Sequence, residues 1–137
     1  MPAQPTIHLT ALAGAPATET QRLGLKSPAQ MVGLVQQHIG RRYRVTGTPT
    51  ILDAPQDPLR GGRRDDAQRA RELQHVFRDE HVRALVAIRG GAWFTRILPR
   101  IDFGLLARRK NPLYIFGFSE MTTLVNLDLV LYFRAAR

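Results

Sequence analysis

The segment Leu113-Tyr114-Ile115-Phe116-Gly117-Phe118-Ser119-Glu120 decides the fold class of this chain. Its first four residues form an apolar run of strand length, and a glycine-containing turn follows directly. A second run, Ala84-Leu85-Val86-Ala87-Ile88, ends in the same way at Arg89-Gly90-Gly91. Continuous apolar runs of this length are typical of parallel strands buried on both faces. We therefore predict two buried parallel strands whose turns lie at the carboxyl edge of one sheet.

Segments of helical periodicity alternate with these strands. Residues 28–39 carry apolar side chains at helical spacing, with Ser27 suited to cap the helix and Gly40 suited to end it. Residues 65–77 begin with two aspartates and carry one apolar stripe, which predicts an amphipathic helix with a solvated opposite face. Residues 121–133 are apolar on nearly every side, which predicts a helix that is buried all round.

Further strands complete the expected sheet. Residues 6–12 alternate in polarity and stop at a small-residue turn, and residues 43–46 read as a short second strand. Residues 53–64, rich in proline, glycine and charge, read as a loop. Strands that alternate with helices predict an α/β fold, a layered and mostly parallel sheet flanked by helices, as a single domain over residues 1–137.

Composition narrows the chemistry and the setting of the protein. The 137 residues are 44% hydrophobic, enough for one core, and they contain no cysteine. Disulfides, a thiolate nucleophile and cysteine metal ligands are therefore excluded. The sequence has no apolar run of roughly 18 residues and no secretory start. We expect a soluble, cytoplasmic protein with no membrane partner.

The net charge of +9 raises nucleic-acid binding as an alternative. The positive charge is nearly all arginine and is scattered over residues 41–44, 60–64 and 108–110, without interleaved stacking aromatics. No nucleic-acid recognition motif accompanies it. Nucleic acid is therefore not the partner we expect first.

The turn at Ser119 has the setting of a nucleophile elbow. It lies between a buried strand and a predicted helix that begins near Met121, so the hydroxyl would be exposed beside backbone N–H groups. The usual glycine two residues after the serine is absent, and an ordinary N-cap serine is the alternative. The Gly90-Gly91 turn could donate an N–H group to an oxyanion, or it could be a plain tight turn.

The histidines offer no convincing general base. His8 lies in the first predicted strand, His38 at a helix end, and His75 and His81 along a charged helical stretch. None has partners at the spacing of a catalytic triad or a metal site. We expect no metal and no cofactor.

Several short motifs follow one another in a fixed order along most of the chain. They are Ala13-Gly14-Ala15-Pro16; Asp66, Arg69, Ala70, Leu73, Phe77, Asp79 and Val82; Arg89, Gly90 and Gly91; Arg96, Leu98 and Asp102; Asn111 and Pro112; and Gly117, Phe118, Ser119 and Thr122. In order and spacing, apart from a two-residue insertion near residues 108–110, this chain resembles the LD-carboxypeptidase family. That family includes the muramoyl-tetrapeptide carboxypeptidases and the microcin C self-immunity proteins.

The resemblance implies a serine-type carboxypeptidase that cleaves an L,D bond of murein tetrapeptides or similar small acylated substrates. It implies that Ser119 is the nucleophile and that the oxyanion hole uses backbone N–H groups of Gly90 or Gly91 and of Glu120. Glu120 replaces the family's usual aspartate, and Ala92-Trp93 replaces its Tyr-Gly.

The family's catalytic Glu and His lie in a C-terminal domain, beyond the last residue of this chain. We therefore expect the chain to be inactive alone, with a small peptide substrate and a separate or missing C-terminal domain as its partners. A noncatalytic binding domain of the same fold and a basic nucleic-acid-binding protein stay as alternatives.

Overall fold

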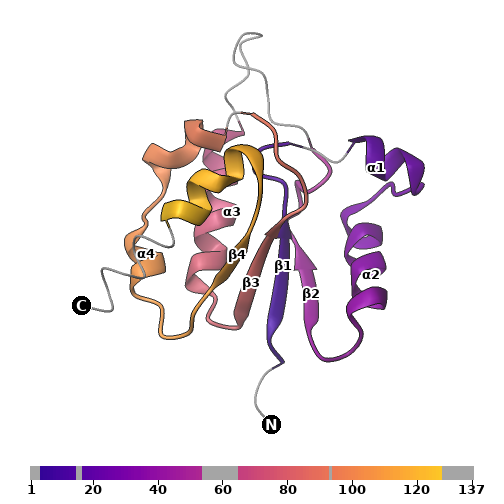
Figure 1. The fold of residues 1–137 in the computed structure, drawn as a ribbon, viewed down its shortest axis with the longest axis horizontal. Coiled ribbons are helices and arrows are strands. Elements are labelled where there is room, and N and C mark those ends of the chain that lie inside the picture. Colours follow the sequence, from indigo (N-terminus) through magenta and orange to yellow (C-terminus); the bar gives the residue numbers. More distant parts are fainter. Residues whose placement is uncertain (1–3, 15–16, 54–64, 93, 128–137) are drawn as a thin grey trace.

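A computed structural model of the chain describes residues 4–14, 17–53, 65–92 and 94–127 (Figure 1). Its elements are β1 (Thr6–Thr10), α1 (Ala17–Arg22), α2 (Pro28–Ile39), β2 (Arg44–Gly47), α3 (Asp66–Arg78), β3 (Val82–Ala87), the 3-10 helix η2 (Phe94–Arg100), α4 (Gly104–Ala107), β4 (Tyr114–Phe116) and the 3-10 helix η3 (Ser119–Met121). The strands form a parallel sheet in the order β2-β1-β3-β4. The predicted α/β fold with a mostly parallel sheet is confirmed.

Helices cover both faces of this sheet. In Figure 1, α2 lies on one side of the strands, whereas α3 and α4 lie on the other. Met31 of α2 shares one apolar core with Leu9 of β1. Leu73 and Phe77 of α3 share the second core with Leu85 of β3. Burial of these side chains supplies the main favourable free energy of folding.

The predicted helix over residues 28–39 is confirmed, and the Ser27 hydroxyl accepts a hydrogen bond from the Gln30 N–H at 3.3 Å. All four predicted strands are present, with ends that differ by one or two residues from those expected. The prediction that both apolar runs are buried strands was wrong for β4, which lies at the edge of the sheet with Tyr114 59% and Phe116 57% exposed. Apart from Asp53, the predicted loop over residues 53–64 lies outside the described residues. The predicted helix after the Ser119 turn is present over residues 122–127, and the rest of it lies outside the described residues.

Two features of the fold correct or extend the sequence interpretation. His81 was expected on a helical stretch, but α3 ends at Arg78 and His81 lies in the turn before β3. The short helices α1, α4 and η2 were not predicted, because segments of four to seven residues carry too little periodicity to detect. None of the helices in the described part of the chain is both long and apolar enough to cross a membrane.

The Arg109 side chain joins the segment before β4 to the end of α3. Its guanidinium group donates to the carbonyl oxygens of Val76, Phe77, Asp79 and Val82 at 2.6–3.1 Å. The last carbonyl groups of a helix have no partner within the helix. Arg109 therefore caps α3 from a distant part of the chain and helps to align β3 and β4.

We expect Arg109→Lys to lower the free energy of unfolding by roughly 2 kcal/mol, because one ammonium group cannot serve all of these carbonyl oxygens. The control is Arg108→Lys. The Arg108 side chain is 67% exposed and pairs with Asp102 at the surface, whereas the Arg109 side chain is 3% exposed. The control should change stability by less than about 0.5 kcal/mol. Urea denaturation followed by circular dichroism compares the two variants, and equal losses would contradict the capping role.

Candidate functional site

Gly90 and Ser119 meet at the carboxyl ends of β3 and β4. A Cβ atom built on Gly90 would lie 2.5 Å from the Cβ atom of Ser119 and 3.1 Å from the carbonyl oxygen of Phe118. Real Cβ atoms do not approach other atoms this closely, so only glycine fits at this position. The structure thus brings together the two turns that the sequence singles out.

The turn after β1 packs against the same place. A Cβ atom on Gly91 would lie 2.2 Å from the carbonyl oxygen of Ala13, and one on Gly14 would lie 2.7 Å from the carbonyl oxygen of Gly90. The Ala92 N–H group donates to the same Ala13 oxygen at 2.9 Å. Three strand ends therefore converge backbone to backbone, and sequence analysis did not foresee the part that Gly14 takes.

Ser119 has a backbone conformation that L-residues rarely adopt. Its φ of 58° is the only positive value at a non-glycine among the described residues, and its side chain is exposed. The N-cap position of η3, with extended backbone, is occupied by Phe118. An ordinary N-cap serine would itself have such an extended conformation. A strained turn that exposes a serine between strand and helix is the geometry of a nucleophile elbow.

The Glu120 carboxylate holds the start of η2 against the serine turn. It accepts hydrogen bonds from the N–H groups of Phe94 and Thr95 at 3.0 and 3.2 Å, and from the Thr95 hydroxyl at 2.8 Å. Since η2 follows the Gly90-Gly91 turn in the chain, Glu120 links the two turns. Sequence analysis considered only the backbone N–H of Glu120 and missed this side-chain role.

A network of charged side chains connects η2, α3 and the turn after β1, which adjoin the site. The Arg96 side chain donates to Asp66 at 2.9 Å and lies 3.4 Å from Asp65, which pairs with Arg69 at 2.7 Å. Arg69 also donates to the carbonyl oxygen of Leu12, next to the turn after β1. Burial lowers the pKa of Arg69, and the Asp65 carboxylate opposes this shift. The predicted solvated face of α3 is present at the exposed Gln68 and Arg71, whereas Asp66 and Arg69 are each only 4% exposed and lie on the buried side.

None of the histidines is placed at the serine turn. His8, His75 and His81 line a cavity at the opposite, amino-terminal edge of the sheet. His38 lies in the last turn of α2, with its Nδ1 atom 2.8 Å from the carbonyl oxygen of Leu34. Within the described ranges, no group of three or more His, Cys, Asp or Glu side chains could hold a metal ion. The roles of Ser119, Gly90, Gly91 and Glu120 in catalysis stay predictions.

Replacing a site glycine should disturb the convergence of the three turns. We expect Gly91→Ala to destabilise the fold by roughly 2 kcal/mol, because the new Cβ atom would overlap backbone that cannot move freely. The control is Gly33→Ala, within α2, where a Cβ atom meets nothing within 4 Å. The control should gain up to about 1 kcal/mol through helix propensity. Thermal unfolding of both variants tests this, and a harmless Gly91→Ala would contradict the close backbone contact.

The strain at Ser119 can be measured with two variants that both lack the hydroxyl. Ser119→Gly relieves the positive φ, whereas Ser119→Ala retains it. We expect the glycine variant to be more stable than the alanine variant by roughly 1 kcal/mol. Urea titrations under identical conditions give the difference. An alanine variant as stable as the glycine variant would show that the turn carries no strain.

Known proteins resemble the chain in sequence and in fold. A Bacillus subtilis (strain 168) protein described as a probable murein peptide carboxypeptidase is 39% identical over 59 residues, which are 43% of this chain and 18% of that protein. The crystal structure of an MccF-like protein from Bacillus anthracis (strain Ames) superimposes with a TM-score of 0.62 at 22% identity, covering 96% of this chain and 36% of that one. Muramoyltetrapeptide carboxypeptidase from Oxalobacter formigenes gives a TM-score of 0.57 at 23% identity, covering 87% and 34%.

The structural likeness at these identities supports the fold, and the chain spans about a third of the length of these two solved proteins. The family follows from the sequence itself. The sequence model of the LD-carboxypeptidase N-terminal domain matches residues 7–130, a span that contains all three converging turns and the serine. This chain belongs to the LD-carboxypeptidase family and corresponds to its N-terminal domain.

Proposed function

We propose that this chain is the nucleophile-bearing part of a serine LD-carboxypeptidase-like peptidase that acts on murein tetrapeptides or similar small acylated substrates. The observation that carries the proposal is the exposed Ser119, with its φ of 58°, packed against Gly90 at the carboxyl edge of the sheet. Membership of the family and the murein peptide named for the Bacillus subtilis relative support the substrate class. A cytoplasmic role in recycling such peptides belongs to the same proposal.

In this proposal the Ser119 hydroxyl oxygen attacks the carbonyl carbon of the scissile peptide bond while a base removes its proton. The carbonyl oxygen becomes an oxyanion, which the backbone N–H groups of Glu120 and of Gly90 or Gly91 stabilise. Collapse of this intermediate breaks the C–N bond, and the departing amine takes up the proton. A water molecule then attacks the carbonyl carbon of the acyl-enzyme, as the serine oxygen did before. The C–O bond to Ser119 breaks, the serine oxygen takes up a proton, and the shortened peptide leaves.

In this proposal two side chains hold the turns of the site in fixed positions. The Glu120 carboxylate ties η2 to the serine turn, so the preceding Gly90-Gly91 turn cannot drift away from the nucleophile. The Arg69 side chain anchors the turn after β1 through the carbonyl oxygen of Leu12. Oxyanion donors must lie near 3 Å from the reacting oxygen, so such bracing has a direct effect on rate.

The general base comes from elsewhere in this proposal. The chain's histidines lie at or toward the other edge of the sheet, and the family's Glu and His belong to a C-terminal domain. Members of a triad act as a unit, and loss of the base leaves only the contribution of the oxyanion hole and substrate binding. We therefore propose that these residues alone hydrolyse peptides too slowly to be useful.

The proposal is tested by joining this chain to the C-terminal domain of a full-length relative, both as a mixture and as a single-chain fusion. The fusion should release the terminal residue of an L,D-tetrapeptide, and the chain alone should not. Ser119→Ala should lower the turnover of the fusion at least ~1000-fold. Ser27→Ala, which removes a hydroxyl that caps α2, serves as the matched control and should retain activity.

Two outcomes contradict the proposal. Turnover by the chain alone that depends on Ser119 would mean that a base lies within these residues. A fusion that hydrolyses the peptide equally well with Ser119→Ala would remove the serine from the mechanism.

A further inference from the structure

A cavity of about 530 Å³ opens at the amino-terminal edge of the sheet. Its walls come from β1, β2, the end of α3 and the turn before β3, and only Val76 and Val82 among its lining residues are apolar. Parallel strands run in one direction, so this edge lies at the opposite end of the strands from Ser119. The cavity is therefore separate from the proposed peptidase site.

One face of β1 is polar, and Thr6 and His8 of this face line the cavity. Thr6, His8 and Thr10 alternate along this strand with Ile7 and Leu9, which belong to the core beneath α2. Strands inside a parallel sheet are normally apolar on both faces. A row of polar side chains on the inner face costs folding free energy unless each finds a partner. Its presence favours a role in binding.

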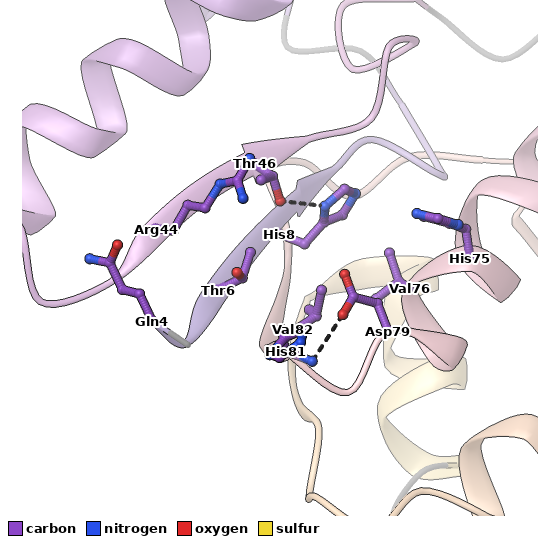
Figure 2. A pocket seen from close by; sticks show the side chains of 10 residues that line it. All are labelled: Gln4, Thr6, His8, Arg44, Thr46, His75, Val76, Asp79, His81 and Val82. Carbon is purple, nitrogen blue, oxygen red and sulfur yellow. Dashed lines mark hydrogen bonds between the residues drawn. The ribbon is translucent and has the colours of Figure 1, made fainter. Parts of the chain in front are cut away.

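His8 is the centre of this cavity. Its Nδ1 atom lies 2.8 Å from the Thr46 hydroxyl oxygen, whereas its Nε2 atom is buried with no hydrogen-bond partner among the described residues. Figure 2 shows the rings of His8 and His75 extending toward each other from β1 and α3. A buried nitrogen without a partner is costly, and a ligand in the cavity could supply that partner.

Groups from every neighbouring element set the charge of the cavity. Arg44 faces it from β2, His75 from α3, Asp79 from the position directly after α3, and His81 from the turn before β3. One Asp79 oxygen already accepts the His81 backbone N–H at 2.9 Å. Near neutral pH the charges of Arg44 and Asp79 balance, whereas protonation of the imidazoles makes the cavity strongly cationic.

We propose that this cavity binds a small divalent oxyanion of the sulfate or phosphate class, held by Arg44, His8 and His75. The guanidinium group offers paired donors that suit such oxygens, and protonated imidazoles add donors and charge. Binding strengthens in more acidic solution, because protonated imidazoles add positive charge to the cavity. A free inorganic ion and a phosphomonoester offer the same chemistry.

The protonation of His8 determines in which direction its effect on folding stability changes with pH. Burial, together with the smaller effect of the neighbouring His75, lowers the pKa of His8 to about 4, and Asp79 opposes the shift. Without an anion, His8 stays neutral in the folded protein but is protonated in the unfolded chain below about pH 6.5. His8 therefore leaves the free energy of unfolding unchanged above about pH 6.5 and lowers it as the pH falls toward 4. A bound dianion favours the protonated imidazole and should raise this pKa.

The experiment measures sulfate binding by the full chain, with sodium chloride of equal ionic strength as the reference. Histidine ring signals in NMR spectra should show the pKa of His8 rising in sulfate. Thermal unfolding should show a larger stabilisation by sulfate at about pH 5.5 than at pH 7.5. Sulfate is used because it keeps both charges over this range. No response beyond that to chloride would overturn the proposal.

Variants locate the site. Arg44→Gln and His75→Gln should each weaken sulfate binding about tenfold, since each removes a charge-assisted donor from an exposed position that the fold does not need. Arg100→Gln removes the same charge from η2, and His38→Gln removes an imidazole from α2; both should bind sulfate normally. Equal losses in the controls would show a diffuse charge effect and contradict a site.

Two further ligands identify the occupant. Glycerol phosphate that binds more tightly than inorganic phosphate would assign the site to a phosphomonoester, and the reverse order would assign it to the free ion. Zinc chloride that shifts the His8 and His75 signals where sulfate does not would overturn the oxyanion proposal in favour of a metal. The readouts do not involve peptidase activity, so their failure leaves the proposed function untouched.

Discussion

The backbone contact among the turns after β1, β3 and β4 is the constraint on which the candidate site depends. Gly90 and Gly91 lie so close to Ser119 and Ala13 that no side chain would fit between them. Such contact fixes the position of the serine relative to nearby N–H groups without any flexible side chain in between. Groups that are already held in one geometry need no reorientation before they react.

The polar bracing around the site follows from this contact. Turns without side chains cannot hold themselves together by apolar burial, so the chain places ionic groups directly behind them. Arg96 and Arg69 connect η2, α3 and the turn after β1 through Asp65 and Asp66. Buried ion pairs contribute little net stability, because desolvation offsets the attraction, but they favour one arrangement over others. Their position behind the strand ends fits a role in defining geometry.

The four strands and the longer helices could be predicted from the sequence because each has its own local pattern of apolar residues. The apolar runs before Gly90 and Ser119 and the capped helix over residues 28–39 are local patterns, and the structure reproduces them. The pairing of Arg109 with the end of α3 and the contact of Glu120 with η2 join residues far apart in the chain. No single-sequence pattern records such contacts. The positive φ of Ser119 was equally hidden, since it results from the turns that enclose it.

The direction of a parallel sheet gives its two edges different chemistry. At the carboxyl edge, glycine turns pack against the strained Ser119 turn without intervening side chains. At the amino edge, β1 offers His8 and its neighbours beside Arg44, a combination whose charge depends on pH. Because β1 contributes to both edges, a ligand that stabilises its amino end also stabilises the strand that carries the first of the three turns. Any coupling between the edges would therefore run along β1, whose register with β3 is continuous from Ile7 to Thr10.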